Sequence, residues 1–421
     1  MSLNLSASEA CPSASRGPFV LVLLFVLLTP FSGARAFADG PVELLQAQAE
    51  IPEASLLDVG IQIFDPGLPD DEYERYRLEE KGVYADVRKA EARYIPLRLK
   101  QTLETTGFWG AVRLVPKTHV VDVRIAGAIH KSTGKDLEID LLVVDSRGKK
   151  WIDKRYKREA NPLAYHDKET IREPFQDLYN EIANDLVKTS RKLDEEDKLE
   201  VHRIAELRFA NYLAPTPFAD YLSVKKSKFK IKRLPSYEDP MMLRLGEIRE
   251  RDFMFVDTLN EYYADFLARM DEPYDGWRAY SYEEQVQLDE IRRTARTQKI
   301  LGIVAAIGGG VIATKSGTRG GRSAGELAMI GGIMAAKAGF EKAEEAAMQR
   351  EALKELAASF DSEVAPILVD VEGEVLRLTG SVDTQYETWR EILRQIFAAE
   401  TGLPLDPNAA PLSATEGPSK N

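Results

Sequence analysis

A ladder of small residues in the last third of the chain constrains its fold most strongly. Residues 300–313 carry no charge, and glycine or alanine recurs there at every fourth position. The same spacing returns some twenty residues later. Residues four apart share one helix face, and faces of small residues let two helix backbones approach closely. The pattern predicts an antiparallel helical hairpin, closed on itself or joined to neighbouring copies along Gly302, Ala306, Gly310, Gly331, Ala335 and Gly339.

The segment between the two ladders adds three cations, Lys315, Arg319 and Arg322, in a glycine-rich stretch. Cations beside an apolar end can bind anionic lipid headgroups, at about 1 kcal/mol each. Neither ladder reaches the roughly 20 apolar residues of a full membrane span. Three roles for the hairpin tip therefore stay open: packing on the same protein, insertion into a membrane, and self-association.

The amino-terminal segment predicts export. An uninterrupted apolar run, residues 19–28, follows Arg16, and small residues spaced for cleavage come at residues 34–38. This order is typical of a secretory signal peptide over residues 1–38. The only cysteine, Cys11, would leave with the signal, so we expect no disulfide, thiol catalysis or zinc-thiolate site in the mature chain. An exported chain without disulfides fits the bacterial periplasm.

The charge balance disfavours nucleic acid as a partner. The chain has a formal net charge of -12, and its basic runs are short and mixed with acids. Such a chain repels phosphate backbones, whereas nucleic-acid binding needs a clustered basic face. The expected partners are envelope proteins, membrane lipid or further copies of the same chain.

Residues 58–192 predict an α/β domain, preceded by a linker at 39–57. Residues 59–63 alternate as a half-buried strand does, and the same period of two returns in three strands of a meander. Two helices accompany these strands, and the first of them ends at Gly107. The residues assigned to the buried faces of these helices are Ala92, Ile95, Leu99, Leu103, Phe175, Leu178, Ile182 and Leu186.

This order of elements resembles a small α/β domain of bacterial envelope proteins. The features that carry the resemblance are the helix end Thr-Gly-Phe-Trp at residues 106–109 and the strand that bears Asp122. The amino-terminal domain of the Tol system's periplasmic propeller protein is similar in layout, as is the periplasmic part of the curli export channel. The resemblance covers roughly residues 57–192. It implies a domain that binds partner proteins or assembles into rings, without catalysis.

Residues 193–280 are expected to be mainly helical, with helix starts at Asp194 and at Asp239-Pro240. A basic cluster at residues 225–233 interrupts them. Its alternating Phe229 and lysines predict an exposed edge strand that resists unwanted pairing, with a basic docking patch as the alternative. A Ser-x-x-Glu capping box at residues 281–284 then predicts the start of a hairpin over 281–360. Outer-membrane glycine-zipper proteins of bacteria resemble its tip.

The carboxyl-terminal residues 361–402 predict a helix, two strands and a second helix. The tight turn Glu372-Gly373 and the strand Leu378-Thr-Gly380-Ser-Val382 resemble the bacterial BON domain. That resemblance implies a periplasmic or membrane-associated binding module. Residues 403–421, rich in Pro, Ala and Ser, are expected to be a disordered tail.

No arrangement of residues predicts catalysis, a metal or a cofactor. The histidines His119, His130, His166 and His202 lack the i, i+4 spacing of helical metal ligands, which favours incidental placement. An acidic loop with Asp65, Asp70, Asp71 and Glu72 lacks the ligand alternation of a calcium loop. We therefore expect no catalytic, cofactor-binding or metal-binding residue.

The predicted fold is α+β, with an amino-terminal α/β sandwich-type domain, a helical middle with a long antiparallel hairpin, and a small carboxyl-terminal α/β module. The predicted function is that of a non-enzymatic, membrane-associated periplasmic protein for partner binding or assembly. The alternative is a periplasmic hydrolase that uses carboxylates of the first domain on an envelope polymer. A deep pocket of convergent carboxylates with raised pKa values would favour the hydrolase.

Overall fold

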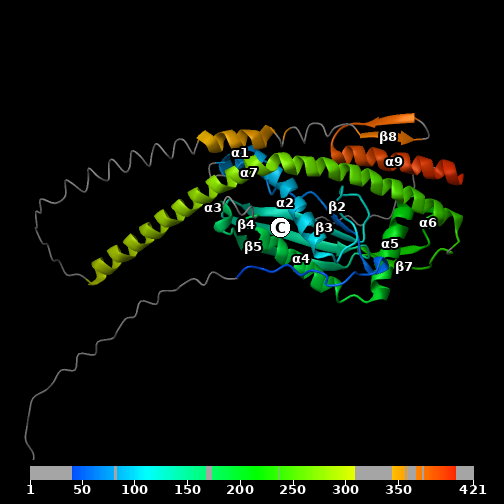
Figure 1. The fold of residues 1–421 in the computed structure, drawn as a ribbon, viewed down its shortest axis with the longest axis horizontal. Coiled ribbons are helices and arrows are strands. Elements are labelled where there is room, and N and C mark those ends of the chain that lie inside the picture. The colour runs from blue at the N-terminus through cyan, green and yellow to red at the C-terminus, as the bar shows by residue number, and fades with distance from the viewer. Residues whose placement is uncertain are drawn as a thin grey trace, which may run out of the picture. The chain divides into compact units, whose positions relative to one another are not determined.

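The chain folds as an α+β protein, which confirms the predicted class (Figure 1). The computed structural model describes residues 40–79, 83–166, 173–236, 238–308, 344–355, 358, 367–371 and 374–403. Contacts divide the chain into two units, Met1–Gly40 and Pro41–Asn421. All helices and strands given below belong to the second unit, and the predicted signal peptide lies outside the described residues.

A mixed five-stranded sheet has the strand order β2-β1-β3-β4-β5. Strand β1 pairs in parallel with β2 and β3, and the rest forms the predicted antiparallel meander. The prediction that β1 is half-buried is wrong: all of its residues are buried, because Val115 and Val121 cover Gly60 while Val59 and Ile61 lie in the apolar core. The strands are β1 (Val59–Ile61), β2 (Val112–Leu114), β3 (Val123–Ser132), β4 (Asp136–Asp145) and β5 (Lys150–Glu159).

Helices α2 (Ala85–Thr106) and α4 (Gln176–Ser190) pack with one face of this sheet in a common apolar core. Helix α2 ends as predicted at Gly107, whose left-handed backbone (φ 68°) suits glycine. Pro96 lies inside α2. The predicted inward residues are all buried: Ala92, Ile95, Leu99, Leu103, Phe175, Leu178, Ile182 and Leu186.

Helix α5 (Glu195–Leu213) begins as predicted, with the Asp194 side chain accepting the backbone N–H of Asp197 at 2.8 Å. The short helix α6 (Pro215–Phe218) and the strands β6 (Leu222–Lys225) and β7 (Lys228–Ile231) follow. The basic cluster is therefore a two-stranded sheet of its own and not the edge of a larger sheet. Buried Phe229 joins it to the β4–β5 turn by donating its backbone N–H to the Arg147 carbonyl at 2.8 Å.

Helix α7 (Pro240–Gly308) is a single helix of 69 residues. It starts as predicted, where the Asp239 carboxylate accepts the backbone N–H of Met241 at 3.0 Å. The predicted second start at Ser281 is wrong. Buried side chains at Met270, Tyr274 and Arg278 keep one helix face in the interior through this region.

The carboxyl-terminal part holds the hairpin of β8 (Ile367–Val371) and β9 (Glu374–Leu378), followed by α9 (Val382–Thr401). Helix α9 packs against α7, with the rings of Trp389 and Phe255 stacked at 5.2 Å between centroids. Residues 344–355 are also helical. The remaining elements are the 3-10 turn η1 (Glu53–Ser55) and the helices α1 (Glu72–Glu79) and α3 (Leu163–His166).

Candidate functional site: the anchor of the long helix

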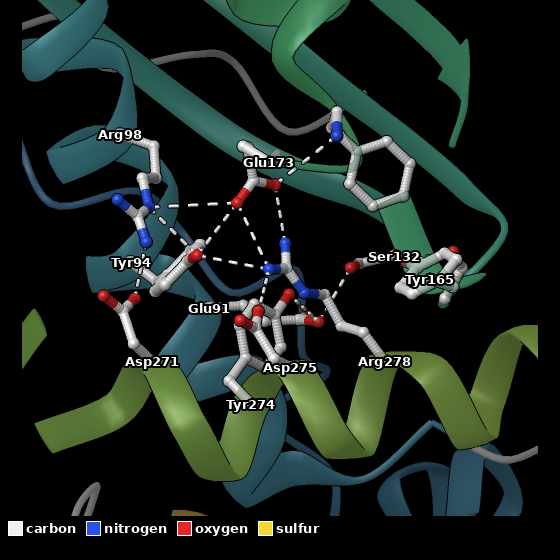
Figure 2. A network of polar contacts seen from close by, with 12 residues as sticks. Glu91, Tyr94, Arg98, Ser132, Tyr165, Glu173, Asp271, Tyr274, Asp275 and Arg278 are labelled. Atoms are coloured by element: carbon white, nitrogen blue, oxygen red, sulfur yellow. Dashed lines mark hydrogen bonds and ion pairs between the residues drawn. The ribbon is translucent and has the colours of Figure 1, made fainter. Parts of the chain in front are cut away.

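Helix α7 is held by a group of polar side chains with a buried centre, which we call the anchor cluster. They come from α2, from β3, from the segment before α4 and from α7 itself. Figure 2 shows them grouped around Arg278 and Glu173. The cluster comprises Glu91, Tyr94, Arg98, Ser132, Glu173, Asp271, Tyr274, Asp275 and Arg278.

The centre of the cluster is the ion pair between Glu173 and Arg278. Arg278 Nη1 lies 2.6 Å from Glu173 Oε1, and the Tyr94 hydroxyl donates to Oε2 at 2.9 Å. The two charged side chains are only 7% and 3% exposed. Burial by itself raises the pKa of Glu173, but Arg278, Arg98 and Tyr94 outweigh it, so the pKa is lowered. An ionised carboxylate with both oxygens occupied holds elements together and does not shuttle protons.

A second carboxylate, Glu91 of α2, links the cluster to the sheet. Its Oε1 accepts from the Tyr274 hydroxyl at 2.8 Å and from the Ser132 hydroxyl at 2.7 Å. On the other side, Arg98 donates to the Tyr94 hydroxyl at 2.9 Å and to Asp271 at 2.5 Å. Helices α2 and α7 are therefore joined at two levels.

The turn between β3 and β4 approaches the backbone of α7 without a side chain between them. A Cβ at Gly134 would fall against the backbone of Arg278 and Tyr282. The backbone N–H of Gly134 donates to the Ser281 hydroxyl at 3.1 Å, so the serine of the predicted capping box serves a tertiary contact. Lys135 then pairs with Asp289 at 2.5 Å.

The helical residues 344–355 pack beside the same part of α7. The Gln349 side chain occupies the space where a Cβ of Gly276 would lie. Leu353 is fully buried in the core that α7 shares, and the Arg350 guanidinium lies 4.6 Å from the centroid of the Tyr84 ring. The chain before the first ladder and the chain after the second ladder thus meet at one place.

The predicted site residues fall largely outside the described residues. Gly302 and Ala306 lie in α7. The predicted contacts between the ladders stay a prediction, as does the role of the loop cations. The residues concerned are Gly310, Gly331, Ala335, Gly339, Lys315, Arg319 and Arg322.

Two of the four histidines occupy polar pairs that sequence spacing did not reveal. His202 Nδ1 lies 2.8 Å from Asp122, and this hydrogen bond raises the pKa of His202 against the effect of burial. Buried His119 lies 2.6 Å from the Tyr386 hydroxyl, which donates to Asp252 at 3.2 Å and so connects α9 with α7. No group of three or more potential ligands within the described ranges is arranged to hold a metal ion.

A cavity of about 700 Å³ lies on the sheet face that carries Leu142 and Val144. It is lined by three carboxylates, and each of them is paired. Asp140 accepts from Arg155 at 2.6 Å, Asp145 from Arg147 at 2.9 Å and Asp153 from Lys150 at 2.8 Å. The hydrogen bond from Arg155 lowers the pKa of Asp140. Carboxylates that are each held by a neighbouring cation do not match the convergent catalytic pair that a carboxylate hydrolase requires.

Comparisons with protein family models, with curated proteins and with solved structures found no match to this chain. A search of the described helices also found none that combines the length and the apolarity needed to cross a membrane. The resemblances to envelope domains therefore rest on their sequence motifs alone. The function has to be inferred from the geometry of this chain.

Proposed function

We propose that this protein is a non-enzymatic, exported cell-envelope protein that binds or assembles partners and uses its glycine-rich segment to associate with a membrane or with its own copies. The observation that carries the proposal is the contact of Gly276 in α7 with Gln349. An antiparallel hairpin requires the two flanks of the ladders to meet in this way.

The anchor cluster supports this role because it fixes the base of the hairpin. Contacts of α7 with the β3–β4 turn extend as far as Asp289, and the helix continues to Gly308. At about 1.5 Å per residue, that extension adds roughly 30 Å of continuous helix. A continuous helix with a buried ionic anchor is suited to hold a functional tip at a fixed distance from the sheet.

The compartment and the partner class come from the sequence. The apolar run before the cleavage-like residues supports export to a periplasm. The resemblance of residues 57–192 to envelope domains, and of residues 361–402 to a BON domain, supports protein binding by both parts. The paired carboxylates of the described cavity favour this function over the hydrolase alternative.

Replacing one small residue of a ladder by a larger one tests the proposal. Ala306→Leu or Ala335→Leu adds three heavy atoms at an expected close contact, and overpacking of this kind costs about 1 to 3 kcal/mol. We expect loss of the high-mass assembly, or of co-sedimentation with membranes, while the first domain stays folded. Ala347→Leu, at an exposed position of the returning helix, is the matched control. Unchanged mass and unchanged fractionation in both ladder variants would contradict the proposal.

Replacing Lys315, Arg319 and Arg322 together by Gln separates the two modes of association. If the tip lies at a membrane surface, the triple variant binds anionic liposomes more weakly, because about 1 kcal/mol per cation is lost. If the tip serves self-association, liposome binding stays unchanged while the Ala306→Leu variant loses the assembly.

A further inference from the structure

The face of the sheet that carries Leu142 and Val144 holds a groove with an apolar floor, which we call the sheet groove. Both side chains are only half-buried, although β4 lies between β3 and β5 in the sheet. Across the strands, Val144 neighbours Arg124 of β3 and Leu142 neighbours Asp153 of β5. Helix α5 and strand β7 contribute Arg208 and Phe229 to the lining.

Two arginines in this groove pair with no carboxylate among the residues that the structure describes. Arg208 donates from Nη1 to the Ser146 carbonyl at 2.9 Å, and its guanidinium lies 4.3 Å from the centroid of the Phe229 ring. Arg124 makes no hydrogen bond or ion pair with any residue that the structure describes. The other cations that line the groove differ in this respect, because Lys150, Lys154 and Arg155 are each paired with an aspartate.

The two guanidinium groups also repel each other. Burial lowers the pKa of Arg124, and burial together with the charge of Arg124 lowers the pKa of Arg208 to about 10. Asp145 acts in the opposite direction, but its Oδ2 already accepts from Arg147 and from Trp151. Both arginines stay protonated at neutral pH. Two half-buried like charges are unfavourable until an anion compensates them.

We infer that the sheet groove binds a soluble phosphate monoester whose organic group rests on Leu142 and Val144. A guanidinium fork matches two oxygens, so a single arginine satisfies a carboxylate, whereas the three terminal oxygens of a phosphoryl group can engage both Arg124 and Arg208. The volume of about 700 Å³ is in the range of small-molecule sites. The floor of two aliphatic side chains suits a compact organic group better than an acyl chain.

Calorimetric titration of the full exported chain with phenyl phosphate tests the inference. We expect saturable binding that Arg124→Gln weakens by about 10- to 100-fold, which corresponds to one lost hydrogen bond to a charged group. Arg203→Gln, an exposed change on the same helix as Arg208, is the matched control and leaves binding unchanged. Arg208→Gln also breaks the bond to Ser146, so Arg124→Gln is the decisive variant.

Three further ligands test which part of the phosphate monoester the sheet groove recognises. Benzoate and inorganic phosphate each lack one half of the predicted ligand and should bind more weakly than phenyl phosphate. Equal binding of benzoate would overturn the assignment to phosphate, and equal binding of inorganic phosphate would overturn the role of the apolar floor. Tight binding to phosphatidic acid vesicles without binding of phenyl phosphate would overturn the assignment to a soluble ester.

Thermal unfolding checks that the binding result does not reflect misfolding. Saturating phenyl phosphate should raise the Tm of the wild-type chain and of Arg203→Gln, because the ligand binds the folded state. The same addition should leave the Tm of folded Arg124→Gln nearly unchanged. An equal rise in Arg124→Gln would contradict the site, as would the absence of binding in the wild-type chain.

Discussion

Arginine occupies two opposite environments in this molecule, the anchor cluster and the sheet groove. In the cluster, Arg278 is 3% exposed and contacts the carboxylates of Glu173 and Asp275. Burial would lower its pKa, but Glu173 and the neighbouring tyrosines raise it well above its ordinary value. In the groove, Arg208 forms no ion pair with a described residue, and its pKa is lowered to about 10. The paired guanidinium belongs to the frame of the fold, and the unpaired one is available to a ligand.

This contrast separates the structural part of the protein from its binding parts. The anchor cluster joins α7 to α2 and the sheet, and its two arginines pair with carboxylates of the same cluster. The charges of the sheet groove are not balanced in this way. Each of its carboxylates is paired with a cation, whereas Arg124 and Arg208 form no ion pair with a described residue. The predictions below test these two regions and the contacts that α7 makes beside the anchor cluster.

The largest effect is expected at the centre of the anchor cluster. Glu173→Gln leaves Arg278 buried without a counter-charge, and breaking a buried ion pair in this way costs about 3 to 5 kcal/mol. Urea denaturation measures the free energy of unfolding. Glu181→Gln, which removes a surface partner of Arg158 at 3.0 Å, should cost no more than about 1 kcal/mol. Equal losses in the two variants would show that the cluster does not hold α7.

A smaller loss is expected where the β3–β4 turn meets α7. Gly134→Ala places a Cβ against the backbone of Arg278 and Tyr282, so we expect destabilisation of about 1 to 3 kcal/mol. Gly246→Ala is the control, because a Cβ there meets nothing within 4 Å and α7 gains a better helix former. Its expected effect is a gain of about 0.5 to 1 kcal/mol in urea denaturation. A gain at Gly134 would contradict the close approach.

Acid should weaken the anchor cluster. The pKa of Glu173 is lower in the folded state than its ordinary value of 4.5. Its stabilising contribution is therefore complete above that value and is lost as the pH falls through the lowered folded pKa. The wild-type chain should lose stability more steeply below pH 4.5 than Glu173→Gln does. Parallel curves for the two chains in urea denaturation at a series of pH values would contradict this assignment.

The smallest effect is expected in the groove and has the opposite sign. Arg124→Gln removes a repulsion with Arg208 and no described contact, so the ligand-free protein should gain about 0.2 to 0.5 kcal/mol, the size of a like-charge term between surface residues. Arg155→Gln removes a bidentate partner of Asp140 and should not gain stability. A loss on changing Arg124 would show that this side chain has a structural partner.

Local patterns were enough to predict much of the fold. The period of two predicted the meander, and the helical spacing predicted the buried faces of α2 and α4. Asp194 and Asp239 marked helix starts correctly because a capping side chain acts within its own turn. The start predicted at Ser281 was wrong because its hydroxyl accepts from Gly134, which is 147 residues away, and does not cap its own turn.

The anchor cluster and the groove could not be predicted in this way. Glu173 and Arg278 lie 105 residues apart, and in sequence each resembles an ordinary surface charge. The groove depends on which charges are left without a partner after folding. Arg124 and Arg155 both lie on the sheet, and only the pairing of β4 with β5 places Asp140 opposite Arg155. Such pairings form only when distant parts of the chain fold together, so they leave no periodic pattern in the sequence.

Cysteine crosslinking at the base of the hairpin tests the central claim most directly. The claim is that α7 and residues 344–355 pack together, so that the glycine-rich segment leaves and rejoins the fold at one place. In a chain that begins at residue 39 and therefore lacks Cys11, the pair Gly276→Cys and Gln349→Cys should form a disulfide readily under mild oxidation. The pair Gly276→Cys and Ala347→Cys should not, because the side chain that lies against Gly276 is that of Gln349. Equal crosslinking of the two pairs, or none in the first, would contradict the account.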